Sequence, residues 1–241
     1  MLIVSLMGLT ACGASDNSNK KEEMYEMSAK IDETTAETYG ECGENLKWYY
    51  QENTLVIRGS GEIDYDDWEE CQDDIQRIII EEGCTSISPN AFKGYKNLIS
   101  VCIADSVMDI GRDAFDNCAA LQELLLPSNL KTIDGAAFHG CKGLENVILP
   151  EGIEEIGGTA FAGCKGLTSF TIPEGITIIE PQTFSNCDNL SEVIIPESVI
   201  CIERRAFFSC DSLKEVVISN EEVEIDNEAF PSTTRVIIGD K

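Results

Sequence analysis

One hydrophobic pattern returns every 23 residues along most of the chain. Phenylalanine marks each return, isoleucine stands five positions before it, and leucine stands six positions after the first six of them. The phenylalanines are Phe92, Phe115, Phe138, Phe161, Phe184, Phe207 and Phe230. A repeat of this length cannot bury its apolar side chains alone, so the pattern predicts a solenoid whose stacked rungs share one core.

Each rung is expected to contain a short strand and a single helical turn. Leu121, Leu124 and Leu126 show L-x-x-L-x-L spacing, which suits a strand that sends alternate side chains inward. Proline follows the strand in four rungs and ends the ladder, because it has no backbone N–H to donate. Two positions after each phenylalanine, glycine, asparagine or serine suits a left-handed exit from the helical turn.

A complete rung, such as residues 144–164, follows the pattern L-x-x-V-x-I-P-x-x-I-x-x-I-x-x-x-A-F-x-x-C. This pattern resembles the BspA-like, or treponemal-type, leucine-rich repeat, and the resemblance covers about residues 75–238. Its carriers in that rung are Leu144, Val147, Leu149, Pro150, Ile153, Ile156, Ala160, Phe161 and Cys164. The resemblance implies a β-rich leucine-rich-repeat solenoid of short strands and single helical turns. It also implies a surface protein that adheres to host or neighbouring-cell proteins.

Both ends of the solenoid, residues 75–241, are expected to be capped, since an open end exposes apolar core and unpaired strand edge. Residues 41–74 predict an N-terminal β cap: a hairpin turning at 51–53 and a loop around Trp68. At the other end Phe230 is followed by Pro231, and the strand 235–238 falls three residues early. These irregularities predict a C-terminal cap.

The N-terminal residues form a short apolar run that ends in Leu9-Thr10-Ala11-Cys12. This run resembles a bacterial lipoprotein signal, although no lysine or arginine precedes Cys12. The resemblance implies a signal peptide at 1–11, a lipid on Cys12, and a cell-membrane location facing the extracellular side, with the lipid as the only membrane contact. Residues 12–40 have few large apolar groups, so they predict a disordered acidic linker.

Composition narrows the classes of function. Acidic residues outnumber basic ones 44 to 17, for a net charge of −27, which repels nucleic acid and anionic lipid. The one histidine, His139, stands at a variable position directly after a phenylalanine. No nucleophile elbow, phosphate-binding loop or zinc-protease motif is present, so we expect no enzyme activity and no cofactor.

The cysteines are candidates for disulfides or metal ligands, and the carboxylates are candidates for metal ligands. Stacked rung cysteines would lie about 4.8 Å apart in a row, which suits neither a disulfide nor a tetrahedral metal site and favours small buried side chains. Cys42 and Cys71, in the cap, are the best candidate disulfide. Cys102 and Cys201 fall in outward columns. Two groups of carboxylates are weak candidates for calcium sites: the run 64–70, and an acidic edge column made of Glu82, Asp105, Ser128, Glu151, Glu174 and Glu197. A solvated charged edge is the favoured interpretation, so no metal is predicted.

Outward positions of the strands suggest a binding surface. The column Cys102, Leu125, Ile148, Thr171, Ile194 and Val217 is largely apolar, which indicates either partner binding or plain β-propensity. The residues predicted to bind are Leu125, Ile148, Ile194, Val217, Glu123, Glu192 and Glu215. The hypothesis is a surface lipoprotein that binds host or bacterial proteins. The alternatives are an envelope structural or assembly lipoprotein and a cation-responsive lipoprotein.

Overall fold

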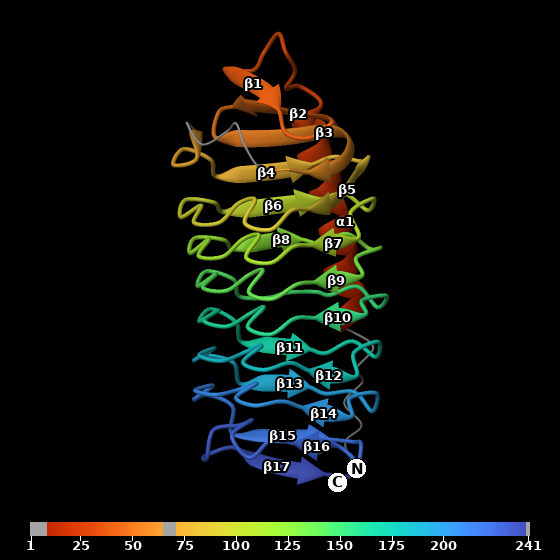
Figure 1. Cartoon of the computed structure of the whole chain (residues 1–241), viewed down its shortest axis with the longest axis vertical. Helices are drawn as coiled ribbons and strands as arrows, with labels where there is room; N and C mark the ends of the chain where they lie inside the picture. Colours follow the sequence, from red (N-terminus) through yellow and green to blue (C-terminus); the bar gives the residue numbers. More distant parts are fainter. Residues whose placement is uncertain (1–8, 65–70, 240–241) are drawn as a thin grey trace.

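The computed structural model describes residues 9–64 and 71–239, and of residues 9–16 the backbone alone. Its rungs stack along one axis into an elongated solenoid, and helix α1 (Leu9–Ser28) runs along the stack beside successive rungs (Figure 1). Most of the expected signal peptide and the acidic loop around Trp68 lie outside the described residues. The solenoid of stacked rungs predicted from the 23-residue pattern is confirmed.

Parallel strands on one side of the rungs form a first ladder, which is interrupted between β8 and β11 at residues 146–149. Its strands are β3 (Thr54–Ile63), β4 (Arg77–Ile80), β6 (Ser100–Ile103), β8 (Glu123–Leu125), β11 (Ser169–Thr171), β13 (Glu192–Ile194), β15 (Glu215–Ile218) and β17 (Arg235–Ile238). Alternate side chains of each strand enter the core, as the L-x-L spacing predicts.

A second ladder carries the inward isoleucine column on the returning side of each rung. Its strands are β5 (Cys84–Ile87), β7 (Asp109–Ile110), β9 (Thr132–Ile133), β10 (Glu155–Ile156), β12 (Ile178–Ile179), β14 (Cys201–Ile202) and β16 (Glu224–Ile225). Neighbouring strands pair in parallel, with Ile110 beside Ile133 and Ile179 beside Ile202, except that β10 and β12 belong to separate sheets. Successive rungs are thus in register over a spacing of one repeat.

The centre of the core is a continuous stack of phenylalanine rings. Six of the seven rings are fully buried, and Phe230 at the C-terminal end is partly buried. Neighbouring ring centroids lie 5.0 to 5.8 Å apart, with the planes nearly parallel in the central rungs. The stack passes without a break through the rung where the first ladder is interrupted. It is therefore the feature that all the rungs share.

The helical turn that carries each phenylalanine adds a third line of hydrogen bonds. The backbone N–H of Phe138 donates to the Ala160 carbonyl one rung on, at 2.8 Å. Asn117 and Asn186 leave the turn with φ of 61° and 60°, as predicted. A second left-handed column lies two positions before each of the first six phenylalanines, and the sequence does not predict it, because residues such as Ala136 and Thr159 occupy it. Each such residue costs roughly 1–2 kcal/mol, which the packed rungs must offset.

Both predicted caps have structural counterparts. Strand β2 (Asn45–Gln51) pairs antiparallel with β3 through a two-residue turn, Glu52-Asn53, with φ of 46° and 64°. Strand β1 (Thr38–Glu41) adds to β2, so the cap begins slightly before residue 41. At the other end Arg235 pairs with Glu215, which places β17 three residues early, as expected.

The prediction of a disordered linker at residues 12–40 is wrong, because the segment is structured. It contains most of α1, a turn, and β1. The side chains of α1 that are at least partly shielded recur at close to helical spacing: Asn17, Lys20, Lys21, Met24, Tyr25, Met27 and Ser28. The segment has too few apolar groups to fold alone, but the solenoid supplies the surface on which it packs. No helix among the described residues is long and apolar enough to cross a membrane.

The phenylalanine stack predicts a large cost for opening it at the middle. Phe161→Ala should lower the free energy of unfolding by roughly 3–5 kcal/mol, because its ring is fully buried between two others. Phe208→Ala is the control: this ring is 45% exposed, so we expect a loss below about 1 kcal/mol. Denaturant unfolding measures both, and equal losses would contradict a packed central rung.

Candidate functional site

The outward strand face consists of the side chains that point away from the core at the third position of the first-ladder strands from β3 to β15, together with Ile148 at the interruption. Its members are Val56, Ile79, Cys102, Leu125, Ile148, Thr171, Ile194 and Val217. The first four are buried, whereas the last four are exposed, with Ile148 at 53%, Ile194 at 38% and Val217 at 37%. Helix α1 accounts for this difference, because it lies over the first half of the column.

The covered half of the outward strand face is an apolar seat for α1. Met24 and Tyr25 belong to the cluster built around Val56 and Ile79. The Tyr25 hydroxyl interacts with the Cys102 thiol, and burial raises the pKa of Tyr25 well above its usual range. Burial also raises the pKa of the Cys102 thiol to about 11. Cys102 therefore points away from the core, as its column predicts, but it is covered by α1.

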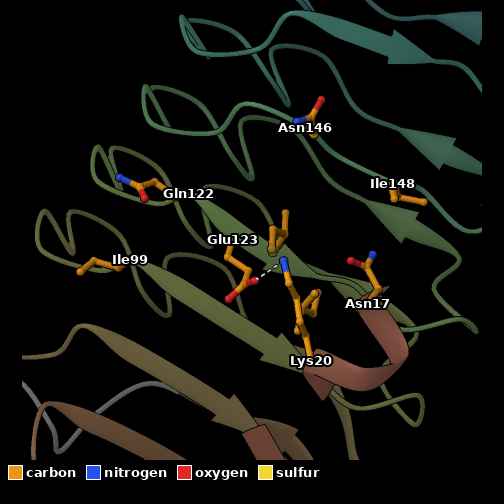
Figure 2. Close-up of a pocket in the computed structure, with 9 residues that line it drawn as sticks. Asn17, Lys20, Ile99, Gln122, Glu123, Asn146 and Ile148 are labelled. Carbon is orange, nitrogen blue, oxygen red and sulfur yellow. Dashed lines mark ion pairs between the residues drawn. The ribbon is translucent and has the colours of Figure 1, made fainter. Parts of the chain in front are cut away.

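Two adjacent lysines of α1 reach carboxylates on opposite sides of the apolar column. Lys20 Nζ lies 2.9 Å from Glu123 Oε1 (Figure 2), and Lys21 Nζ lies 3.0 Å from Asp105 Oδ1. Partial burial opposes ionisation of Asp105, but hydrogen bonds from the Ser128 backbone N–H and from Lys21 lower its pKa overall. The lysines thus fix α1 across the face as well as along it.

Leu125 and Glu123, both predicted as binding residues, lie at the end of this seat. Leu125 is 2% exposed, and Glu123 is paired with Lys20 and 34% exposed, so α1 already contacts this part of the face. Beside them is an open hollow of about 370 Å³, lined also by Asn17 and Ile148 (Figure 2). The hollow marks the boundary between the covered and the exposed halves of the face.

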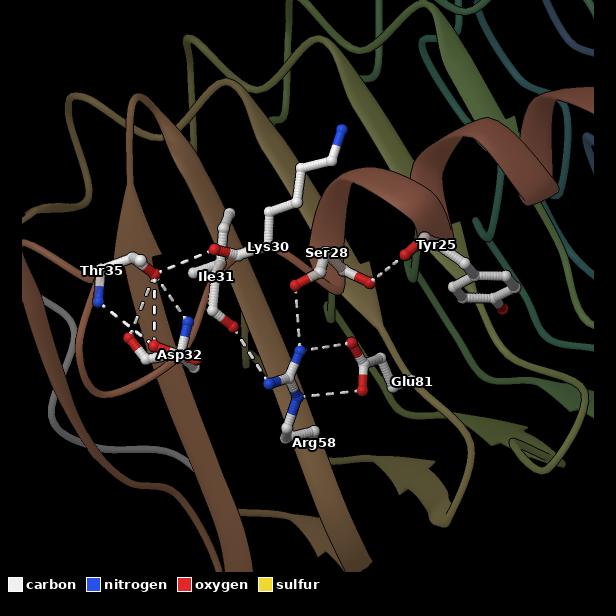
Figure 3. A network of polar contacts seen from close by, with 8 residues as sticks. All are labelled: Tyr25, Ser28, Lys30, Ile31, Asp32, Thr35, Arg58 and Glu81. Carbon is white, nitrogen blue, oxygen red and sulfur yellow. Dashed lines mark hydrogen bonds and ion pairs between the residues drawn. The ribbon is translucent and has the colours of Figure 1, made fainter.

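Arg58 holds the C-terminal end of α1 to the solenoid (Figure 3). Its Nη2 donates to the Ser28 carbonyl at 3.0 Å, and its Nη1 donates to the Ile31 carbonyl at 3.0 Å. Nε and Nη2 also donate to the two oxygens of Glu81, at 3.0 and 2.7 Å. The last carbonyls of a helix lack partners within it and carry partial negative charge, so a guanidinium at this place satisfies both requirements.

Sequence reasoning missed α1 and its anchor, although both left signals. Arg58 and Glu81 stand one 23-residue repeat apart, so the rung spacing already places them side by side. In α1, Lys21 and Tyr25 are four positions apart, and Ser28 follows three positions later, which is the spacing of one helical face. The low apolar content of the segment hid this pattern.

The rung cysteines are buried, as their positions predict, and each makes one further contact. The Cys141 thiol donates to the Phe115 carbonyl at 3.3 Å, and the Cys164 thiol donates to the Phe138 carbonyl at 3.2 Å. Burial raises the pKa of Cys164 to about 12. All ten cysteines with described side chains are free, so the candidate disulfide between Cys42 and Cys71 is not formed.

Other charged groups form ion pairs without building a reactive site. His139 Nδ1 lies 2.6 Å from Asp116 Oδ1, and Lys93 Nζ lies 3.1 Å from the other oxygen of that largely buried carboxylate. The acidic edge column bonds to backbone: Asp105 Oδ1 accepts from the Ser128 N–H at 2.8 Å. In the described part of the chain, no group of three or more histidine, cysteine, aspartate or glutamate side chains could hold a metal ion.

Comparison with known sequences identifies the repeat. A family model described as a BspA type leucine rich repeat region matches residues 61–187 and 108–237, with six copies. This match covers well over half of the chain. No curated protein is similar enough in sequence to match.

Solved structures show the same architecture. A leucine rich cell surface protein from Faecalibacterium prausnitzii is 29% identical, with a TM-score of 0.63 over 83% of this chain and 53% of its own. A leucine-rich repeat protein from Bacteroides ovatus is 24% identical, with a TM-score of 0.66 over 82% of this chain and 55% of its own. The leucine rich repeat protein of T. pallidum is 23% identical, with a TM-score of 0.62 over 81% of this chain and 88% of its own. The chain thus spans about half the length of the first two.

Thiol burial predicts a sharply uneven reactivity. Of the ten described cysteines, Cys201 alone is partly exposed, so iodoacetamide should modify it first in the native protein at pH 8. Cys118 and Cys164 should stay unmodified until denaturant is added, because burial keeps both thiols protonated. Peptide mass spectrometry reads each site separately. Native-state modification of the rung cysteines at the rate of Cys201 would argue against a closed core.

The anchor of α1 predicts a specific change in the same labelling. Arg58→Ala removes two donors from the helix end and the pair with Glu81, so α1 should open more often and Cys102 beneath it should react at least several-fold faster. Arg77→Ala is the matched control, because Arg77 lies on the neighbouring strand and contacts Thr54 instead. If Cys102 labelling were the same in both variants, Arg58 would have no role in holding the helix.

Proposed function

Because the chain belongs to the BspA-type leucine-rich repeat family, we propose that it is a bacterial cell-surface lipoprotein whose solenoid binds other proteins. Repeats of this kind form protein-binding and scaffold modules, and a matching structure is described as that of a cell surface protein. A fold does not by itself fix a function, so the proposal depends on the surface of this chain.

The observation that carries the proposal is the uncovered half of the outward strand face. Ile148, Ile194 and Val217 are exposed on a sheet whose equivalent residues in the first rungs are buried under α1. Exposed apolar side chains that gather on one surface and are bordered by charge are typical of protein-binding sites. Glu192 and Glu215 supply that border, and Glu215 also lies 3.3 Å from Arg235. We expect contacts spread over several rungs and not concentrated in a pocket.

The proposed attachment is a lipid on Cys12. The support is the motif Leu9-Thr10-Ala11-Cys12 and the apolar run before it. The Cys12 side chain is not among those described. A surface location would place the acidic solenoid where it meets host proteins and neighbouring cells. A purely structural or assembly role in the envelope is the alternative, and it predicts bacterial partners only.

Capture experiments test binding and separate these two roles. Immobilised full-length chain, exposed to host matrix and to bacterial envelope extracts, should retain host proteins if the chain is an adhesin. Ile148→Arg, Ile194→Arg and Val217→Arg should each weaken capture two- to fivefold, and capture should fall as salt rises. Ile200→Arg, at an exposed isoleucine outside the face, is the control. Retention of envelope proteins alone would favour the assembly role, and equal capture by all four variants would exclude this face.

Lipidation has a separate test. The chain expressed in a bacterium with its native start should incorporate labelled palmitate and partition into detergent. Cys12→Ser should abolish both, because a thioether-linked lipid needs that sulfur. Cys201→Ser, at the most accessible of the described thiols, controls for general loss of a cysteine. Unchanged detergent partition in Cys12→Ser would refute the anchor.

A further inference from the structure

The contacts that hold α1 recur further along the solenoid. In the covered half, Asp105 and Glu123 stand 18 positions apart and take the two adjacent lysines of the helix. Glu174 and Glu192 are also 18 positions apart, and they occupy the same places three rungs further on. Both are exposed. The carboxylate pair of the α1 seat is therefore repeated on rungs that no described helix covers.

The apolar part of the seat is repeated in the same register. Three rungs beyond Ile79, Cys102 and Leu125 stand Ile148, Thr171 and Ile194. Thr171 occupies the place of Cys102, with which the Tyr25 hydroxyl interacts, so a polar side-chain atom is kept there as well. The α1 seat and the rungs three repeats further on therefore share three features: the apolar column, a polar atom within it, and a carboxylate on each side.

The recurrence is selective, since the pattern does not return at every rung. Of the four steps after the α1 seat, only the last two have two carboxylates: Glu174 with Glu192, and Glu197 with Glu215. In the last pair, Glu215 already contacts Arg235. One step after the α1 seat the two places hold Ser128 and Asn146, and at the next step they hold Glu151 and Ser169. Neither step offers two carboxylates across the column. Acidic composition alone therefore does not produce the pair at Glu174 and Glu192, although the net charge of −27 adds a long-range attraction for a basic partner.

We propose that β11 and β13 form a second helix seat, which binds an amphipathic α-helix of a partner protein carrying two adjacent lysines beside an aromatic or methionine side chain. The proposal rests on the protein-binding function proposed above and names its partner chemistry. The helix would lie along the stack as α1 does, with one lysine on Glu192 and the next on Glu174. Its apolar side chains would cover Ile148 and Ile194.

The second seat differs from the first at one point. The place of Arg58, three rungs on, is held by Pro127, on the rung of Leu125 that α1 already covers, so a second helix would end before this rung and find no such donor. The seat therefore supports weaker, reversible binding, whereas α1 is retained by Arg58 and by its covalent link to the cap. This difference suits an external partner, and it explains why charge reversal is a sensitive test.

The test uses two stapled helical peptides and the full-length chain. The first peptide has the sequence of residues 17–31 of this protein, since that helix is known to fit the equivalent seat, and the second carries Lys20→Glu and Lys21→Glu. Fluorescence anisotropy measures their binding. We expect the first peptide to bind the wild-type chain and to lose about tenfold in affinity against the double variant Glu174→Lys, Glu192→Lys. The charge-reversed peptide should bind that variant better than it binds the wild type.

Glu151→Lys is the matched control, because it reverses one charge in the same edge column at a step without a facing carboxylate. It should change affinity less than twofold. A loss as large as that of the double variant would reduce the effect to general electrostatics and overturn the proposal. A loss caused by Glu123→Lys instead would show that the peptide exchanges with α1, and this too would overturn it.

The remaining outcomes are also decisive. Absence of peptide binding, with capture from extracts intact, would refute the helix seat and leave the proposed function standing. Loss of extract capture as well would refute both. Concentration-dependent dimerisation that Glu174→Lys and Glu192→Lys abolish together would assign the seat to a second copy of this chain and would overturn the assignment to a partner protein.

Discussion

A rung of this solenoid is stable only between neighbours that repeat its geometry. Its phenylalanine ring has another ring on each side at little more than 5 Å, and its backbone donors find acceptors one repeat away. Both distances are set by the separation of parallel strands, so every residue of the core has to keep the same register. This requirement explains the small cysteine three positions after the ring. It fits the limited space, and its thiol reaches the carbonyl of the preceding rung.

The same requirement makes the ends of the stack a problem. The first rung has no repeat before it, and the hairpin of β2 and β3 takes that place by pairing its second strand with β4. The last ring, Phe230, stacks on one side only, and β17 closes the ladder in a shortened register. Strict repetition in the centre and irregular ends are two results of one constraint.

Register also decides how much the sequence could predict. The core columns can be predicted from the sequence because each is filled by one type of residue, and the cap hairpin can be predicted from the residues of its turn. The positive φ of Ala136 and Thr159 could not be predicted, since neither residue type favours that conformation. Helix α1 was missed for another reason: its stability comes from Arg58 and from an apolar strip on the solenoid, and neither is part of its own segment. That docking buried Leu125 and Cys102, which the strand pattern alone places outside.

The position of α1 changes the mechanical meaning of the N-terminal segment. A disordered linker of some thirty residues would allow the solenoid a wide range of positions and orientations above a membrane. With side chains from Asn17 onward docked, only four residues separate Cys12 from the body of the protein. Even fully extended, they span less than about 20 Å. If Cys12 carries the proposed lipid, a short tether holds the solenoid close to the membrane and restricts its orientation. The distance over which the protein can contact another cell is then set by the length of the solenoid.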